Sequence, residues 1–139
     1  MITVAVGIVY DPSDPERVLL CQRNRTARYP LKWEFPGGKL EERESPEDSL
    51  RRELKEELGI EVIDAKLFHQ QRVTYPDGRS FEVFYFIIPS FRGALSNNVF
   101  EAVEWVNIRN ISSYDLLEGN REAVQKFIRY HETNRAVKS

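Results

Sequence analysis

The strongest structural signal in the sequence is one helix with both of its ends marked. Ser45 favours the N-cap, Pro46 suits the first helical position, and Gly59 suits the position just past the last turn. Between these ends leucines recur every fourth residue, at Leu50, Leu54 and Leu58. The sequence therefore predicts a helix over 46–58 that buries its leucine face against a sheet, each leucine contributing roughly 1.5–3 kcal/mol if fully buried.

The same helix gathers glutamates on a neighbouring face. Glu53, Glu56 and Glu57 share a sector about 100° wide, and converging carboxylates repel one another unless cations offset them. Arg52 can compensate one carboxylate but not all of them. Oxygen ligands at this density suit Mg²⁺ or Mn²⁺. The alternative is a solvated helix face with ion pairs such as Arg52 with Glu56, and the helix alone favours that alternative.

The two glycines that precede the helix favour the metal site. Gly37-Gly38 follows Pro36 and is expected to leave regular structure. Without side chains, this segment allows the backbone to pass close to a ligand and to place a bare carbonyl oxygen beside the helix. The segment and the helix together predict a site that holds a metal ion and phosphate.

Hydrophobic periodicity predicts a mixed α/β fold around that helix. Apolar residues alternate in the first strand with the period of a half-buried strand, at Ile2, Val4, Val6, Ile8 and Tyr10. The expected strands are 2–10, 18–22, 33–35, 60–71, 79–91 and 102–106, followed by a helical turn near 112–117, an amphipathic helix over 120–132 and frayed residues 133–139. This order predicts a mixed sheet covered by helices, in one domain over residues 1–139.

Charge and cysteine content exclude several classes of partner. The formal net charge is −2, so the chain lacks the basic field that a nucleic-acid polymer requires. Cys21 is the only cysteine, which fits a reducing cytoplasm, and its apolar neighbours predict a buried strand residue. No signal peptide is recognisable, and no apolar stretch approaches the roughly 20 residues that span a bilayer. We therefore expect a cytoplasmic protein, monomeric or homodimeric, that binds no membrane.

A known motif covers this central region. The residues Gly38, Glu44, Arg52-Glu53-Leu54, Glu56-Glu57 and Gly59-Ile60 occupy every fixed position of the Nudix box, GX5EX7REUXEEXGU, where U is a bulky aliphatic residue. The chain therefore resembles the Nudix hydrolase family over the box and its flanking strands. The resemblance implies an α/β/α sandwich, a mixed sheet between helices, and Mg²⁺-dependent or Mn²⁺-dependent hydrolysis of a nucleoside diphosphate linked to another moiety.

The resemblance also implies roles for individual residues. The implied metal ligands are the Gly37 carbonyl, Glu53, Glu56 and Glu57. Glu44 and Arg52 are expected to hold the loop and the helix together by a salt bridge, and Lys39 to contact phosphate. Water then attacks phosphorus while the metal neutralises developing charge, and Glu53 is favoured for deprotonating that water.

Outside the box, three segments and one basic residue stand out: Ala5–Ile8, Trp33–Lys39, Leu117–Asn120 and Arg23. They resemble the MutT subfamily, which hydrolyses oxidised purine nucleoside triphosphates such as 8-oxo-dGTP to the monophosphate and pyrophosphate, a reaction of nucleotide-pool sanitation and DNA repair. The resemblance implies that Asn120 reads the base, because a carboxamide offers both a donor and an acceptor. Arg23 and Phe35 would contact the substrate, and apolar strand residues such as Val4, Val6 and Phe35 would sandwich the ring.

Several of these residues have a plainer interpretation. Asn120 also suits the N-cap of the last helix, Arg23 the surface, and Phe35 the core. Trp105 is expected in or near the core. Many relatives carry one more metal-binding glutamate before this tryptophan, where Glu101 and Glu104 compete in this chain. Glu101 is preferred because it lies nearer the loop. Tyr75-Pro76-Asp77 also resembles the MutT pattern but is interpreted first as a turn.

The Nudix box specifies the chemistry but not the nucleotide base. Within the family, CTP or dCTP, ADP-ribose and dinucleoside polyphosphates are the alternative substrates. A catalytically silent nucleotide-binding module is a different class of function. Such modules typically lose box glutamates, and this sequence keeps all of them.

Overall fold

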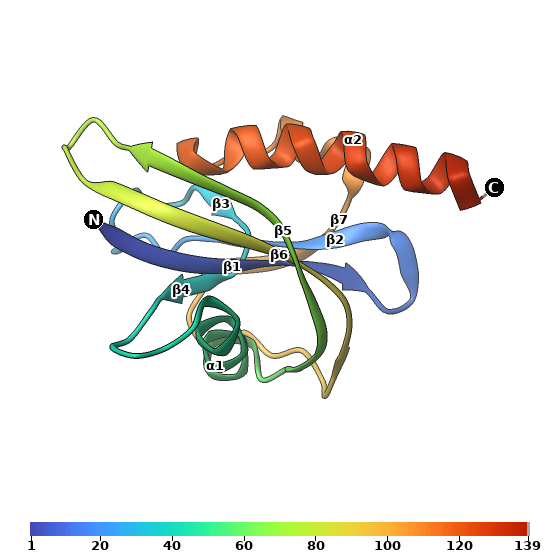
Figure 1. Cartoon of the computed structure of the whole chain (residues 1–139), viewed down its shortest axis with the longest axis horizontal. Coiled ribbons are helices and arrows are strands. Elements are labelled where there is room, and N and C mark those ends of the chain that lie inside the picture. Colours follow the sequence, from blue (N-terminus) through green and yellow to red (C-terminus); the bar gives the residue numbers. More distant parts are fainter. Residues whose placement is uncertain (139) are drawn as a thin grey trace.

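A mixed sheet forms the middle layer of the protein, whose computed structural model describes residues 1–138 (Figure 1). Within these residues the sheet has seven strands in the order β3-β2-β1-β6-β5, with β4 added to β1 and β7 to β2. The strands are β1 (Ile2–Asp11), β2 (Asp14–Gln22), β3 (Trp33–Glu34), β4 (Gly37–Lys39), β5 (Glu61–Thr74), β6 (Ser80–Arg92) and β7 (Ala102–Asn107). The helices are α1 (Pro46–Leu58), α2 (Arg121–Lys138) and the 3₁₀ helices η1 (Ile108–Ser113) and η2 (Glu118–Asn120).

Strand β1 runs through the centre of the sheet. It pairs in parallel with β6, from Ile2 opposite Phe81 to Val9 opposite Ile88, and antiparallel with β4 on its other side. Both of its faces are covered, so the expectation of a half-buried strand is wrong. The residues that alternate with the predicted apolar positions form a second buried face. On that face, Ala5 and Val9 are fully buried in the cluster that contains the leucines of α1.

Helix α1 has the predicted bounds and the predicted caps. The Ser45 hydroxyl accepts a hydrogen bond from the Asp48 N–H at 3.1 Å. Gly59 ends the helix in the left-handed conformation, at φ 71°, and its N–H donates to the Lys55 carbonyl. The three leucines of the stripe are fully buried against the sheet. The helix that covers this face of the sheet therefore forms as the local sequence predicts.

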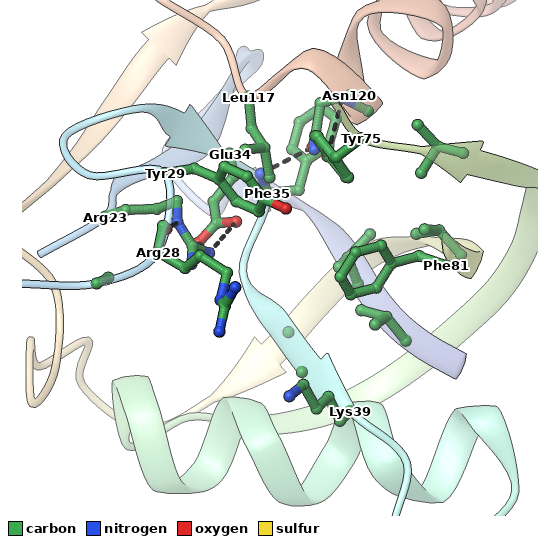
Figure 2. A pocket seen from close by; sticks show the side chains of 18 of the residues that line it. Arg23, Arg28, Tyr29, Glu34, Phe35, Lys39, Tyr75, Phe81, Leu117 and Asn120 are labelled. Carbon is green, nitrogen blue, oxygen red and sulfur yellow. Dashed lines mark hydrogen bonds and ion pairs between the residues drawn. The ribbon is translucent and has the colours of Figure 1, made fainter. Parts of the chain in front are cut away.

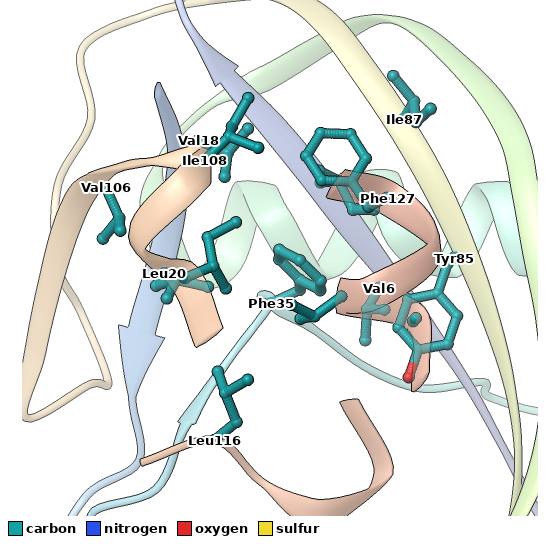
Figure 3. Close-up of a cluster of buried hydrophobic side chains, with 14 of the residues drawn as sticks. Val6, Val18, Leu20, Phe35, Tyr85, Ile87, Val106, Ile108, Leu116 and Phe127 are labelled. Carbon is teal, nitrogen blue, oxygen red and sulfur yellow. The ribbon is translucent and has the colours of Figure 1, made fainter. Parts of the chain in front are cut away.

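Helix α2 covers the opposite face of the sheet (Figure 1). Its apolar residues Ala123, Val124 and Phe127 are fully buried in a cluster that includes Phe35 and Tyr85 (Figure 3). The predicted amphipathic helix is present, but it continues to Lys138, whereas residues 133–139 were expected to fray. Of that segment, Ser139 lies outside the described residues. Two helices on opposite faces of one mixed sheet confirm the α/β/α sandwich.

Other segment boundaries differ from the sequence prediction. Gly37–Lys39 does not leave regular structure, because it pairs with β1 as β4. Strand β2 begins at Asp14, not at residue 18, and the helical turn expected near 112–117 overlaps η1 only at residues 112 and 113, while η2 begins at Glu118. The early start of β2 comes from a hairpin pairing, with Asp14 opposite Asp11, whereas Gly37–Lys39 becomes a strand by pairing with a distant segment of the chain.

Two smaller predictions concern single side chains. Cys21 is fully buried in β2, as predicted. Trp105 lies partly buried on β7, with its ring stacked on Phe91 at a centroid distance of 6.4 Å, which confirms its place near the core. Within residues 1–138, no helix has the length and apolar character needed to cross a membrane.

Candidate active site

A cavity of about 460 Å³ opens beside the first half of β1 (Figure 2). Its apolar walls come from the sheet, through Val4, Val6, Val73, Phe81 and Val83. Among the residues predicted for the site, the lining includes Arg23, Phe35, Gly37, Lys39, Glu57 and Asn120. In Figure 2, Asn120 lies at one end of the cavity and Lys39 at the end near α1.

Strand β4 brings the two glycines against β1 and α1. Gly37 has a φ of 154°, and a Cβ added there would collide with the Ala5 carbonyl oxygen. A Cβ added to Gly38 would lie 2.5 Å from the Glu53 carboxylate carbon. The Glu53 carboxylate thus lies directly over the Gly38 backbone. Glycine is required at position 37, where the clash is with backbone atoms, whereas a side chain at position 38 would displace the Glu53 carboxylate.

Arg52 connects the loop after β4 to helix α1. It donates to both Glu44 carboxylate oxygens, from Nε at 2.7 Å and from Nη2 at 3.0 Å, and to the Lys39 carbonyl at 3.2 Å. Its Nη1 pairs with Glu53 at 3.0 Å and with Glu56 at 3.3 Å. The hydrogen bonds from Arg52 and from the Glu41 N–H lower the pKa of Glu44 to about 2. The expected salt bridge is therefore present.

Glu57 is the buried carboxylate of the site. Its Oε1 is inaccessible and has no hydrogen-bond partner among the described residues. Burial, followed by the negative charges of Glu53 and Glu34, raises the pKa of Glu57 to about 8, although the Gly37 N–H opposes the rise. A divalent cation bound to this unpaired oxygen would neutralise the negative charge of the neighbouring carboxylates. The residues present therefore fit a Mg²⁺ ion.

The carboxylates do not enclose a cation by themselves. In the described part of the chain, no three acidic, histidine or cysteine side chains are gathered closely enough to hold a metal ion. Glu53 and Glu56 are both engaged by Arg52. Proteins commonly bind Mg²⁺ through one or two carboxylates, with water and substrate phosphates as the other ligands. An open donor set of this kind suits an ion that arrives with a nucleotide.

Glu101 and Glu104, the two alternatives for a further metal ligand, do not lie with the carboxylates of α1. Glu101 forms a two-oxygen pair with Arg25, at 3.3 and 2.8 Å, which lowers the pKa of Glu101. Glu104 accepts a hydrogen bond from the Tyr114 hydroxyl at 2.8 Å. Among the described residues that line the cavity are Val99 and Phe100, but neither of the two glutamates.

The loop before β7 holds the C-terminal end of α1. The Ser96 N–H donates to the Leu58 carbonyl at 2.8 Å, and the Asn98 N–H donates to the Glu57 carbonyl at 3.0 Å. The Asn98 side chain also donates to the Glu56 carbonyl at 2.9 Å. The last carbonyls of a helix have no partners within the helix. This loop supplies hydrogen-bond donors to those carbonyls and thereby fixes the backbone that carries Glu56 and Glu57.

Asn120 is almost fully buried at the opposite end of the cavity, with 7% of its surface exposed. Its Oδ1 accepts a hydrogen bond from the Phe35 N–H at 3.3 Å rather than from an N–H of α2 (Figure 2). Phe35 lines the cavity but is only 1% exposed, and its ring packs edge-on against Tyr85. Phe35 is therefore both a core residue and the residue that orients Asn120.

Arg23 points into the site and is not an ordinary surface residue. Its Nη1 lies 3.1 and 3.2 Å from the two oxygens of Glu34, and its Nε donates to the Arg28 carbonyl at 2.8 Å. Burial raises the pKa of Glu34, and the Arg23 charge opposes that rise. The sequence pattern did not single out Glu34. The one available signal was an acidic residue between two aromatic residues in a short strand.

Tyr75 was predicted as a turn residue, and the structure places it in the site as well. The predicted turn is present, since the Gly78 N–H donates to the Tyr75 carbonyl at 2.8 Å. However, the Tyr75 ring is 8% exposed, lines the cavity and stacks on Tyr29 at a centroid distance of 4.6 Å. The Tyr29 hydroxyl donates to Asp77 at 2.6 Å. The loop after β2 is thereby joined to the β5–β6 turn at the cavity.

Similarity to known proteins assigns this arrangement to a family. A model of the NUDIX domain family matches residues 1–128. The chain belongs to the Nudix family. It is a MutT-like Nudix hydrolase and acts as a nucleotide pyrophosphohydrolase, a class of enzymes that uses divalent metal cations. The family assignment made from the box is confirmed.

Individual relatives of this Nudix hydrolase are similar over most of the chain but are named for different substrates. An 8-oxo-dGTP diphosphatase from Proteus vulgaris is 36% identical over 93 residues, which cover 67% of this chain and 80% of the relative. A CTP pyrophosphohydrolase from Escherichia coli (strain K12) is 32% identical over 114 residues, covering 81% and 82%. A solved structure of MutT, from work on Aliivibrio salmonicida and Vibrio cholerae, has a TM-score of 0.78 at 29% identity and covers 93% and 98%.

Proposed function

We propose that this Nudix hydrolase converts 8-oxo-dGTP, or a related oxidised purine nucleoside triphosphate, to the monophosphate and pyrophosphate with Mg²⁺. The observation that carries the proposal is the buried Asn120 carboxamide, which the Phe35 N–H orients at the end of the cavity opposite α1. Glu57 of α1 and Lys39 also line the cavity, and Lys39 lies at the end near α1, where the phosphates of such a nucleotide would bind. The cavity thus offers a base end and a phosphate end.

The hydrogen-bonding pattern of Asn120 favours an oxidised purine. The Phe35 N–H uses one lone pair of Oδ1, which leaves a second lone pair and the two Nδ2 protons for a ligand. An 8-oxoguanine edge presents the O6 acceptor beside an N7–H donor, and a carboxamide complements both. Normal guanine has an acceptor at N7, so one of these bonds would be missing. Rejection of the normal nucleotide requires such an unmet polar contact.

At the phosphate end, the ion would be held by the Gly37 carbonyl, Glu53, Glu56 and Glu57. A bound Mg²⁺ supplies charge neutralisation at the phosphates and lowers the pKa of water. Glu53 accepts the proton of the attacking water, and Lys39 contacts a phosphate at the cavity rim. Glu44 and Arg52 act by positioning the loop against the helix. Glu101 joins the ligands only if it is released from Arg25.

CTP is the second candidate substrate. It is favoured by the 32% identity to a CTP pyrophosphohydrolase, of which the matched region covers 82%. A carboxamide can also pair with cytosine, because that base presents a donor and an acceptor on one edge. ADP-ribose, dinucleoside polyphosphates and a silent binding role lack a comparable observation.

A substrate panel tests the proposal. The purified protein is assayed with Mg²⁺ against 8-oxo-dGTP, dGTP, CTP, ADP-ribose and a dinucleoside polyphosphate, with substrate loss and nucleotide products followed by chromatography and pyrophosphate and phosphate measured separately for the triphosphates. The expected result is the highest kcat/KM for 8-oxo-dGTP, with pyrophosphate as the product. A higher kcat/KM for CTP would replace the proposed substrate by the second candidate. No hydrolysis of any of these nucleotides would overturn both.

A further inference from the structure

The short helix η2, which carries Asn120, is held by one glycine. The Gly119 N–H donates to the Tyr75 hydroxyl at 3.0 Å. The Gly119 carbonyl accepts from the Tyr85 hydroxyl at 3.0 Å and from the Gln71 side chain at 2.8 Å. Three side chains of β5, β6 and the turn between them thus converge on a single residue adjacent to Asn120.

The contact between Tyr75 and this glycine is close. A Cβ added to Gly119 would collide with the Tyr75 hydroxyl and would lie 3.3 Å from a Val73 methyl group. Helix η2 has only three residues, and no side chain caps its first residue. A segment this short has little stability of its own. Its position therefore depends on the groups that bind Gly119, together with the bond from the Leu117 N–H to the Trp33 carbonyl at 2.8 Å and the start of α2 at Arg121.

Asn120 is fixed from two sides. Its own side chain accepts from the Phe35 N–H, and the peptide that precedes it is bound through the Gly119 carbonyl. The Tyr75 hydroxyl, which binds the Gly119 N–H, belongs to a ring that lines the cavity, as the Tyr85 ring does, and that also stacks on Tyr29. Loss of that hydroxyl would allow η2 to shift without removing any atom of Asn120.

We propose that Tyr75 is a positioning residue for base discrimination: its hydroxyl holds Gly119 so that the Asn120 carboxamide meets the base edge. The proposal rests on the proposed function, in which Asn120 reads an oxidised purine. Tyr75 would then contribute to substrate choice through Asn120 rather than through a hydrogen bond of its own to the base.

The test is Tyr75→Phe, which keeps the stacked ring and removes only the hydroxyl. The readout is the ratio of kcat/KM for 8-oxo-dGTP to kcat/KM for dGTP. We expect this ratio to fall by about 3-fold to 10-fold, as the loss of one hydrogen bond predicts. The matched control is Tyr114→Phe, which removes a hydroxyl bound to Glu104 outside the cavity lining and should leave the ratio unchanged. A general loss of stability lowers both rate constants and does not change their ratio.

A double-mutant cycle separates positioning from direct contact. If Tyr75 acts through Asn120, Tyr75→Phe lowers the ratio in the wild-type background and has no further effect in Asn120→Ala. An equal effect in both backgrounds would show a direct contact with the nucleotide and overturn the positioning role. So would an unchanged ratio in Tyr75→Phe beside a lowered ratio in Asn120→Ala. An unchanged ratio in Asn120→Ala would instead overturn the base-reading role, and the positioning role with it.

Discussion

The Arg52 guanidinium donates to both oxygens of the Glu44 carboxylate, from Nε at 2.7 Å and from Nη2 at 3.0 Å. Two parallel charge-assisted bonds fix orientation as well as distance. Arg52 also pairs with Glu53, so the angle of the Glu53 side chain depends on a residue eight positions before Arg52. The loop after β4 and the helix α1 are thereby assembled as one unit.

The first prediction concerns the Glu44–Arg52 ion pair. Glu44→Gln should lower turnover by about 10-fold to 100-fold, because groups that orient metal ligands typically carry effects of that size. Steady-state kinetics at saturating Mg²⁺ provide the measurement. Glu47→Gln, which breaks an exposed pair with Arg51, is the matched control and should retain full activity. Wild-type turnover in Glu44→Gln would show that the Glu44–Arg52 ion pair is dispensable for catalysis.

The second prediction concerns the carboxylates of α1. Glu53→Gln and Glu57→Gln should each lower kcat by about 10²-fold to 10⁴-fold, while thermal stability without metal stays similar or rises, because a repulsive charge has been removed. Glu61→Gln, an exposed glutamate at the start of β5, is the control and should behave as wild type. Activity that survives both substitutions would exclude the metal site.

The third prediction is a pH dependence of stability in the absence of metal. The pKa of Glu57 rises from 4.5 to about 8 on folding, so the folded protein binds a proton at this group that the unfolded chain has already released. Stability should therefore fall as pH rises from about 4.5 to about 8. Thermal unfolding in EDTA across this range measures the slope, and Glu57→Gln should flatten it. An identical slope in wild type and Glu57→Gln would contradict this account of Glu57.

The fourth prediction concerns Asn120. Asn120→Ala should lower the preference for 8-oxo-dGTP over dGTP by about 10-fold or more, because it removes both groups that pair with the base edge. Turnover of dGTP should fall less. The ratio of the two kcat/KM values is the measurement, and Asn110→Ala, at an exposed residue of η1 outside the cavity lining, is the control. An unchanged ratio would remove Asn120 from base recognition.

The phosphate end was largely predictable from sequence because its residues lie close together along the chain. The helix over 46–58 follows from Ser45, the leucine spacing and Gly59, and the structure reproduces its caps. The Glu44–Arg52 pair spans only eight residues. The base end was not predictable to the same extent. Asn120 is joined to Phe35 across 85 positions, and Tyr75 is joined to Gly119 across 44.

The sequence by itself determined the family, the helix that carries the glutamates and the glycines that lie against it. These depend on local capping, on helical periodicity and on the absence of a side chain, all of which can be read within a short window. Only the tertiary structure decided that Glu57 keeps an unpaired buried oxygen, that Glu101 is bound by Arg25, and that Tyr75 is a cavity wall as well as a turn residue. Burial and pairing of this kind depend on which distant strands become neighbours, and neighbouring residues in the chain do not specify that.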